Sequence, residues 1–160
     1  MARRIIDRLD AIVAILVILA MAGMVTTVSA QVFLRYALNS SFDWAEEVSR
    51  LLFVWSIFLA IPLGVKRGAH VGIDLLTSHL PSSASTALFR IASLIGIALM
   101  GVVAWQAAIL TRDQWDEPMT TLDISIGLFM LPLAIGAAHA ILHLLIAAID
   151  GAPGKETVVE

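Results

Sequence analysis

Long runs of apolar residues that contain no charged residue dominate the chain. No Asp, Glu, Lys or Arg occurs in residues 11–34, 91–111 or 124–149. Each run exceeds the roughly 20 residues that an α-helix needs to cross about 30 Å of hydrocarbon. The runs are continuous, whereas the strands of a membrane β-barrel alternate over about 10 residues. The pattern therefore predicts an all-α integral membrane protein, because a helix satisfies its own backbone hydrogen bonds in lipid.

A fourth apolar run, residues 51–65, is too short to span a membrane alone at about 1.5 Å per residue. It becomes long enough if its helix begins near Asp43 and carries charges on its first turns. The predicted transmembrane helices cover about residues 9–35, 43–66, 85–111 and 124–149. Together they form a single four-helix membrane domain over residues 1–160, without a separate soluble domain.

Short punctuating segments separate these helices. Lys66-Arg67-Gly68 ends the second helix, and the apolar segment 70–76 is predicted to lie in the membrane interface. Pro81 followed by serines predicts the start of the third helix, with serine as its cap. Pro132 is expected to kink the fourth helix. Because the connections are short, consecutive helices are expected to be antiparallel neighbours.

The distribution of Lys and Arg predicts the orientation. Seven lie at the N-terminus, after the second helix, at the start of the third or in the tail, and three lie on the opposite side. The richer side is expected to be cytoplasmic. Arg3, Arg4 and Arg8 precede an apolar run much longer than a signal-peptide core, so we expect a retained first helix. Both termini are then cytoplasmic, in a bacterial inner membrane.

Composition excludes several classes of function. The chain is 59% hydrophobic and 14% charged, and it has no cysteine for disulfides or thiolate metal sites. No basic soluble region is large enough to bind nucleic acid. The sequence has no P-loop, nucleophile elbow, zinc-protease or dinucleotide-binding motif. We therefore predict a membrane subunit that is not an enzyme and carries no cofactor or metal.

The charged start of the second helix is the most informative polar segment. Asp43 and Glu46 have the spacing of a capping box, and Glu46 and Glu47 lie four and three residues before Arg50. These charges either sit in water at headgroup depth and cap the helix, or face another protein or Arg35. The second interpretation is preferred because charged residues at the head of a spanning helix are costly against acyl chains.

Small residues and histidines mark the last two spans. Small residues recur at four-residue spacing, as in Ala92 and Gly96 or Gly136 and Ala140, which lets helix backbones approach closely. His139 and His143 lie one turn apart near the cytoplasmic end of the fourth helix. Such a pair can bind a metal or haem. Hydrogen bonding between helices or to interfacial water is the preferred interpretation, because di-haem proteins usually pair histidines from different helices.

Three motifs resemble those of a known family when taken together. They are Gln31-Val-Phe-Leu-Arg35-Tyr36, Trp44-Ala-Glu46-Glu47-Val-Ser-Arg50 and Gly64-Val-Lys-Arg-Gly-Ala-His70-Val-Gly-Ile73-Asp74. In this series the chain is similar to the small membrane subunit of tripartite ATP-independent periplasmic (TRAP) transporters, the DctQ family. Length, number of spans and orientation agree with that resemblance. The third and fourth spans match it in character only.

The resemblance implies a three-part importer. A periplasmic binding protein captures an organic acid, such as a dicarboxylate or a sugar acid, and a large multi-span membrane subunit moves it inward by sodium or proton symport. The small subunit binds the large one as a scaffold. By matching position, Arg35, Trp44, Glu46, Glu47 and Arg50 form a subunit-contact and structural cluster on the outer side. His70 and Asp74 hold the inner connection.

Three alternatives remain open at the level of sequence. One is a scaffold unrelated to transport, which only the identity of its partner would distinguish. The small subunit of the tripartite tricarboxylate transporters has a similar form. A haem-binding membrane anchor of a quinone-linked oxidoreductase would use His139 and His143 instead. A Soret band in the purified protein would favour the anchor.

Overall fold

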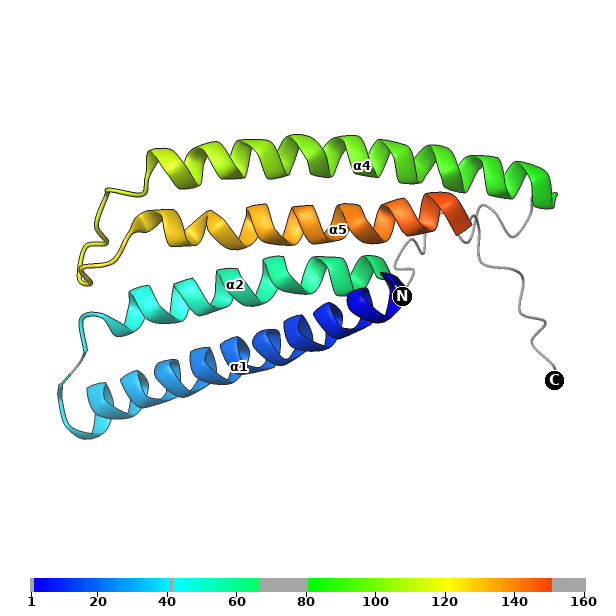
Figure 1. The fold of residues 1–160 in the computed structure, drawn as a ribbon. Helices are drawn as coiled ribbons and strands as arrows, with labels where there is room; N and C mark the ends of the chain where they lie inside the picture. The colour runs from blue at the N-terminus through cyan, green and yellow to red at the C-terminus, as the bar shows by residue number, and fades with distance from the viewer. Residues whose placement is uncertain (1, 41, 67–80, 151–160) are drawn as a thin grey trace, which may run out of the picture.

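The computed structural model describes residues 2–40, 42–66 and 81–150 of the chain (Figure 1). The elements are the α-helices α1, α2, α4 and α5 and the short 3₁₀ helix η1, in the order α1 (Ala2–Ala37), α2 (Ala45–Lys66), α4 (Ser82–Asp113), η1 (Ile126–Phe129) and α5 (Leu131–Asp150). Within the described ranges, all four α-helical segments are long and apolar enough to cross a membrane, the last counted together with η1. The predicted all-α membrane fold is confirmed. The predicted interfacial segment at 70–76 lies outside the described residues.

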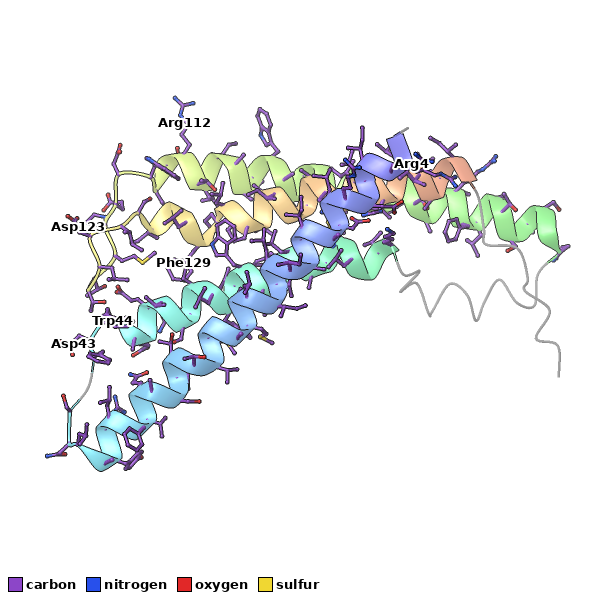
Figure 2. The ribbon with its side chains drawn as sticks, turned by 60° about the horizontal axis from the view of Figure 1, so that its bottom comes forward. Arg4, Asp43, Trp44, Arg112, Asp123 and Phe129 are labelled. Atoms are coloured by element: carbon purple, nitrogen blue, oxygen red, sulfur yellow. The ribbon has the colours of Figure 1, made fainter. Side chains whose placement is uncertain are left out.

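The helices form a layer in the spatial order α1, α2, α5, α4 (Figure 1). α2 packs against α1 on one side and α5 on the other, and α4 packs against α5. The expectation that consecutive helices are neighbours is therefore right for α1 with α2 and for α4 with α5. It is wrong for α2 and α4, because α5 lies between them. Seen from a second direction, α1 crosses the layer obliquely (Figure 2).

Small residues explain why α5 takes the central place. A Cβ atom added at Gly136 of α5 would lie 2.2 Å from the backbone oxygen of Phe58 in α2, so the two backbones touch there. On the side towards α4, a Cβ atom at Gly96 would lie 3.2 Å from a methyl group of Leu144. The predicted close approach at small residues is thus observed at Gly136 and Gly96. Helix α5 has one such contact with each of its neighbours.

The helix ends differ from the prediction where local chemistry intervenes. Helix α2 begins at Ala45 rather than near Asp43, after a turn in which the Ala45 N–H donates to Phe42 O. Residue 81, a proline without a side-chain cap bond, takes the N-cap position of α4 that we expected a serine to fill. Asn39 follows α1 with φ of 49°, the left-handed conformation that commonly ends helices.

The predicted fourth helix is divided in two. The 3₁₀ helix η1 occupies residues 126–129, and α5 begins only at Leu131. Pro132 therefore lies in the first turn of a helix, where its missing N–H removes no helical hydrogen bond, and the predicted kink within a long helix is wrong. The Ser125 hydroxyl accepts a hydrogen bond from Gly127 N–H at 3.0 Å and caps η1.

The connection between α4 and η1 is folded into a small hairpin, residues 114–125. Met119 N–H donates to Ile124 O and Ile126 N–H donates to Glu117 O, both at 2.8 Å. Trp55 of α2 donates its indole N–H to Leu128 O in η1 at 3.0 Å. The hairpin and η1 therefore form an ordered cap over one end of α2.

Apolar side chains cover the outer helices of the layer. On α1, Ile18 is 65% exposed, and on α4, Ile95 and Trp105 are 64% and 68% exposed. Such continuous apolar surface is expected to meet lipid or another membrane protein.

Candidate functional site

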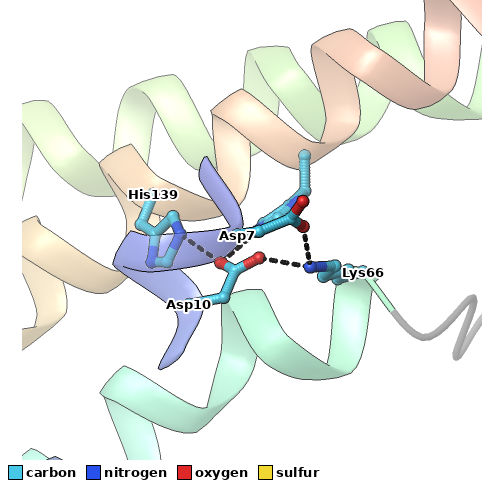
Figure 3. A network of polar contacts seen from close by, with 5 residues as sticks. Asp7, Asp10, Lys66 and His139 are labelled. Carbon is cyan, nitrogen blue, oxygen red and sulfur yellow. Dashed lines mark hydrogen bonds and ion pairs between the residues drawn. The ribbon is translucent and has the colours of Figure 1, made fainter. Parts of the chain in front are cut away.

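Two polar clusters lie at opposite ends of the layer. The first, here called the Asp10 cluster, lies at the end that holds the N-terminus and consists of Asp7, Asp10, Lys66, His139 and His143 (Figure 3). The second consists of Glu46, Glu47 and Arg50 of α2 with the hairpin. It lies at the end of the molecule that holds Asp43, Trp44 and Asp123, opposite the end that holds Arg4 (Figure 2). The first has a buried core of Asp10, His139 and His143 between helices, and the second joins α2 to the hairpin.

Asp10 is the hub of its cluster. Its Oδ1 lies 2.9 Å from His139 Nε2 and 2.9 Å from His143 Nε2, and its Oδ2 lies 2.7 Å from Lys66 Nζ. Asp10, His139 and His143 are all buried. A carboxylate that pairs with an ammonium group accepts hydrogen bonds, so both imidazoles donate through Nε2–H. Asp10 thereby links α1 to α2 and α5.

Lys66 has a second carboxylate partner. Its Nζ donates to Asp7 Oδ1 at 2.7 Å as well as to Asp10. The Asp7 side chain is 64% exposed, whereas that of Asp10 is 8% exposed. The exposed Lys66–Asp7 pair is therefore screened by solvent and contributes little on its own, while the Lys66–Asp10 contact is part of a buried network.

The histidine pair has the kind of role that the sequence favoured, hydrogen bonding between helices. The sequence analysis did not identify its partner, because nothing in the local pattern around Asp10 singles it out. Depth along the helices is the signal that could have identified this partner. Asp10 lies near the start of α1, Lys66 ends α2, and both histidines lie within about three turns of the end of α5. These three helix ends lie at the same end of the layer (Figure 1).

Glu47 anchors the hairpin. Its Oε1 accepts the Thr120 N–H at 2.9 Å, and its Oε2 accepts the Thr121 hydroxyl at 2.6 Å. The Thr121 N–H lies 3.1 Å from each carboxylate oxygen. The predicted pairing of Glu47 with Arg50 is therefore replaced by a bond to a loop more than seventy residues away.

The other predicted outer residues are placed as follows. Arg50 donates to Glu46 Oε1 at 2.7 Å, which confirms the predicted i, i+4 pair, and both side chains are largely exposed. Trp44 stacks on Phe42 with ring centroids 5.2 Å apart. Arg35 is exposed in the last turn of α1 and pairs with none of these charges among the described residues. His70 and Asp74 lie outside the described residues.

A groove of about 550 Å³ lies beside Glu47 between α2, the hairpin, η1 and α5. Glu47 and Arg50 are its charged lining residues, and Phe129 of η1 lies on the side of η1 that faces α2 (Figure 2). The lining is mainly apolar and comprises Glu47, Arg50, Val54, Phe58, Met119, Thr120, Ile126, Phe129, Met130 and Leu133. Two of the residues singled out in the sequence, Glu47 and Arg50, therefore line this groove. Trp44 and Glu46 are close to them in the sequence, at the start of α2.

Comparison with known families matches residues 24–154 to the DctQ component of the tripartite ATP-independent periplasmic transporters. The chain belongs to the DctQ family. The match covers α2, α4, η1, α5 and residues 24–37 of α1, so it includes every residue of the predicted contact cluster. Four apolar helices in a DctQ protein indicate a multi-pass protein of a bacterial inner membrane.

Individual relatives of this DctQ protein carry different substrate names. The sialic acid TRAP transporter small permease protein SiaQ of Vibrio cholerae is 29% identical over 144 residues, 88% of this chain and 80% of that protein. The C4-dicarboxylate TRAP transporter small permease protein DctQ of Rhodobacter capsulatus is 28% identical over 92 residues, 58% of this chain and 40% of that protein.

A longer relative is also matched. The isethionate TRAP transporter permease protein DctMQ of Oleidesulfovibrio alaskensis is 26% identical over 132 residues. That alignment covers 69% of this DctQ chain but only 21% of the relative. The chain therefore spans about a fifth of that protein's length.

Proposed function

We propose that this chain is the small permease subunit of a TRAP-type secondary transporter that imports an organic acid, such as a dicarboxylate or a sugar acid. It works with a large multi-span membrane subunit and a periplasmic binding protein. The observation that carries the proposal is the DctQ match over residues 24–154. The relatives named for sialic acid and C4-dicarboxylate support the substrate class. As a component of a transporter family, the chain is not expected to be an enzyme.

The partner is proposed to be the large subunit, and the structure offers it an apolar surface. The exposed faces of α1 and α4 and the groove beside Glu47 provide area for contact with another membrane protein. The relative DctMQ, in which a region like this chain makes up about a fifth of a longer permease, supports a direct association. These features favour a scaffold whose work is done in a complex.

The orientation proposed is that both termini lie in the cytoplasm. The excess of Lys and Arg lies at the end that holds the N-terminus of α1 and Lys66. The hairpin and the groove then face the periplasm, where a binding protein would dock. Tyr36, Trp44 and Trp115 at that end are exposed, as interfacial aromatic residues are.

The outer contact cluster remains Arg35, Trp44, Glu46, Glu47 and Arg50. Within it, Glu47 holds the hairpin, and Arg50, which pairs with Glu46, lines a mainly apolar groove. A partner helix with an apolar face fits this surface. His70 and Asp74 are proposed to hold the inner connection.

Replacing Glu47 by alanine is expected to reduce uptake several-fold and to lower the yield of the intact complex. The hairpin would lose the carboxylate that holds Thr120 and Thr121, and one wall of the groove would become mobile. Substrate uptake in whole cells and recovery of the large subunit with the tagged chain measure the effect.

Glu46→Ala is the comparison within the same cluster, and it is expected to reduce uptake less than Glu47→Ala because it leaves the hairpin bonds intact. Glu46 bonds only Arg50 among the described residues, and exposed i, i+4 pairs contribute about 0.3–0.5 kcal/mol. If Glu47→Ala and Arg50→Ala both left complex yield and uptake unchanged, the contact role of this cluster would be wrong.

Identification of what co-purifies with the chain tests the proposed function itself. The tagged protein, extracted from its native membrane in mild detergent, is expected to bring down a hydrophobic protein of many spans in near-equal amount. The fractions are expected to show no Soret band. A haem-coloured complex with a soluble dehydrogenase would overturn the assignment.

A further inference from the structure

The Asp10 cluster contains three atoms of the kinds that bind transition metals. Asp10, His139 and His143 each offer one ligand atom, and these atoms all lie within 4.8 Å of one another. His139 Nε2 and His143 Nε2 are each 2.9 Å from Asp10 Oδ1, as hydrogen-bonded atoms are. In a tetrahedral zinc site, ligands bonded at about 2.0–2.1 Å lie roughly 3.4 Å apart. The carboxylate and the imidazoles would therefore have to separate by about half an ångström to hold one ion between them.

The ligands are held by rigid elements. His139 and His143 lie one turn apart on α5, so their side chains leave the same face of the helix. Their ring centroids are 5.0 Å apart. Asp10 approaches from α1, and all three residues are buried. A site built on α1 and α5, which both pack against α2, would need only a small outward shift of the ligands to admit an ion.

The surrounding charges form an outer shell for the carboxylate. Lys66 donates to Asp10 Oδ2, which orients the carboxylate and leaves Oδ1 directed at the histidines. Asp7 in turn pairs with Lys66 and balances its charge. Summed over these five side chains, with neutral imidazoles, one negative charge remains. A partly buried negative charge favours a bound cation, and ligating carboxylates are usually hydrogen-bonded in this way.

We propose that Asp10, His139 and His143 bind one divalent transition-metal ion, best suited to Zn²⁺, which joins α1 to α5. Imidazole and carboxylate ligands select zinc-like ions, because Mg²⁺ and Ca²⁺ prefer oxygen alone. On binding, each imidazole proton passes through solvent from Nε2 to Nδ1, so the imidazoles stay neutral and Nε2 is free to ligate. Water completes the coordination. This departs from the sequence-based expectation of no metal.

Metal titration of the tag-free full chain in detergent, stripped with chelator beforehand, tests the proposal. The wild type is expected to bind one Zn²⁺ per chain and to gain thermal stability. Asp10→Asn, His139→Ala and His143→Ala are each expected to lose stoichiometric binding. Asp7→Ala keeps all three ligands, so its affinity is expected to fall by about tenfold at most.

Absence of saturable binding to the wild type would overturn the proposal, as would binding that His143→Ala leaves unchanged. Substitution by Co²⁺ gives a second readout that needs no variant. Visible absorption bands that report nitrogen ligation and disappear on addition of Zn²⁺ support the site. A spectrum identical to aqueous Co²⁺ shows that the three residues form hydrogen bonds only.

Discussion

Gly136→Ala is expected to destabilise the protein by weakening the contact between α2 and α5. The new methyl carbon would lie 2.2 Å from Phe58 O, a backbone atom that cannot turn aside. Overpacking of this kind costs about 1–3 kcal/mol, and rigid backbone on both sides places this site at the upper end. Helix propensity alone predicts the opposite sign, since alanine is favoured over glycine by about 1 kcal/mol.

The thermal unfolding midpoint in detergent measures this effect, with recovery of monodisperse protein as a second readout. Gly101→Ala is the matched control, because a Cβ atom there meets nothing within 4 Å. Its midpoint should equal or exceed that of the wild type. A Gly136→Ala variant as stable as Gly101→Ala would show that α2 and α5 do not approach as closely as described.

Asp10→Ala is expected to be the most damaging change at the other polar cluster. It removes the acceptor of two buried imidazoles and one partner of Lys66. Leaving a buried donor unpaired costs about 1–3 kcal/mol, and Lys66 keeps Asp7, so the two imidazoles together are expected to cost about 2–6 kcal/mol. The free energy of unfolding, measured in denaturant with chelator present, reports the hydrogen-bonded network without any metal.

Asp7→Ala provides the comparison. It removes the exposed partner of the same Lys66 and is expected to cost no more than about 1 kcal/mol. Equal losses for the two variants would mean that Asp10 is as well solvated as Asp7. The role of Asp10 as the link between α1, α2 and α5 would then fall.

Much of the fold follows from the sequence because the membrane sets it. A span needs a minimum length of apolar chain, so the runs before Arg35, after Arg50 and on either side of the hairpin predict four helices. The three motifs that carry the family resemblance are short stretches of sequence, so they can be recognised without a structure. Neither argument depends on which helix packs against which.

The remaining features depend on contacts between distant residues. Close contacts at Gly136 and Gly96 accompany the place of α5 between α2 and α4. Each glycine belongs to a small-residue pair at four-residue spacing, a pattern that is common in membrane helices and does not indicate which helix is the partner. Local spacing suggested that Glu47 pairs with Arg50. In the structure the Glu47 carboxylate instead accepts the backbone N–H groups of Thr120 and Thr121 in the hairpin. The role of Asp10 could not be predicted, because its partners His139 and His143 lie about 130 residues away in the sequence.

The layered arrangement of α1, α2, α5 and α4 has a geometric consequence. Helices α2, α5 and α4 lie side by side, and α1 lies obliquely against α2 (Figure 2). This arrangement exposes more perimeter in the bilayer plane than four helices gathered into a square bundle. The protein therefore offers a neighbouring membrane protein a wide lateral face for its size.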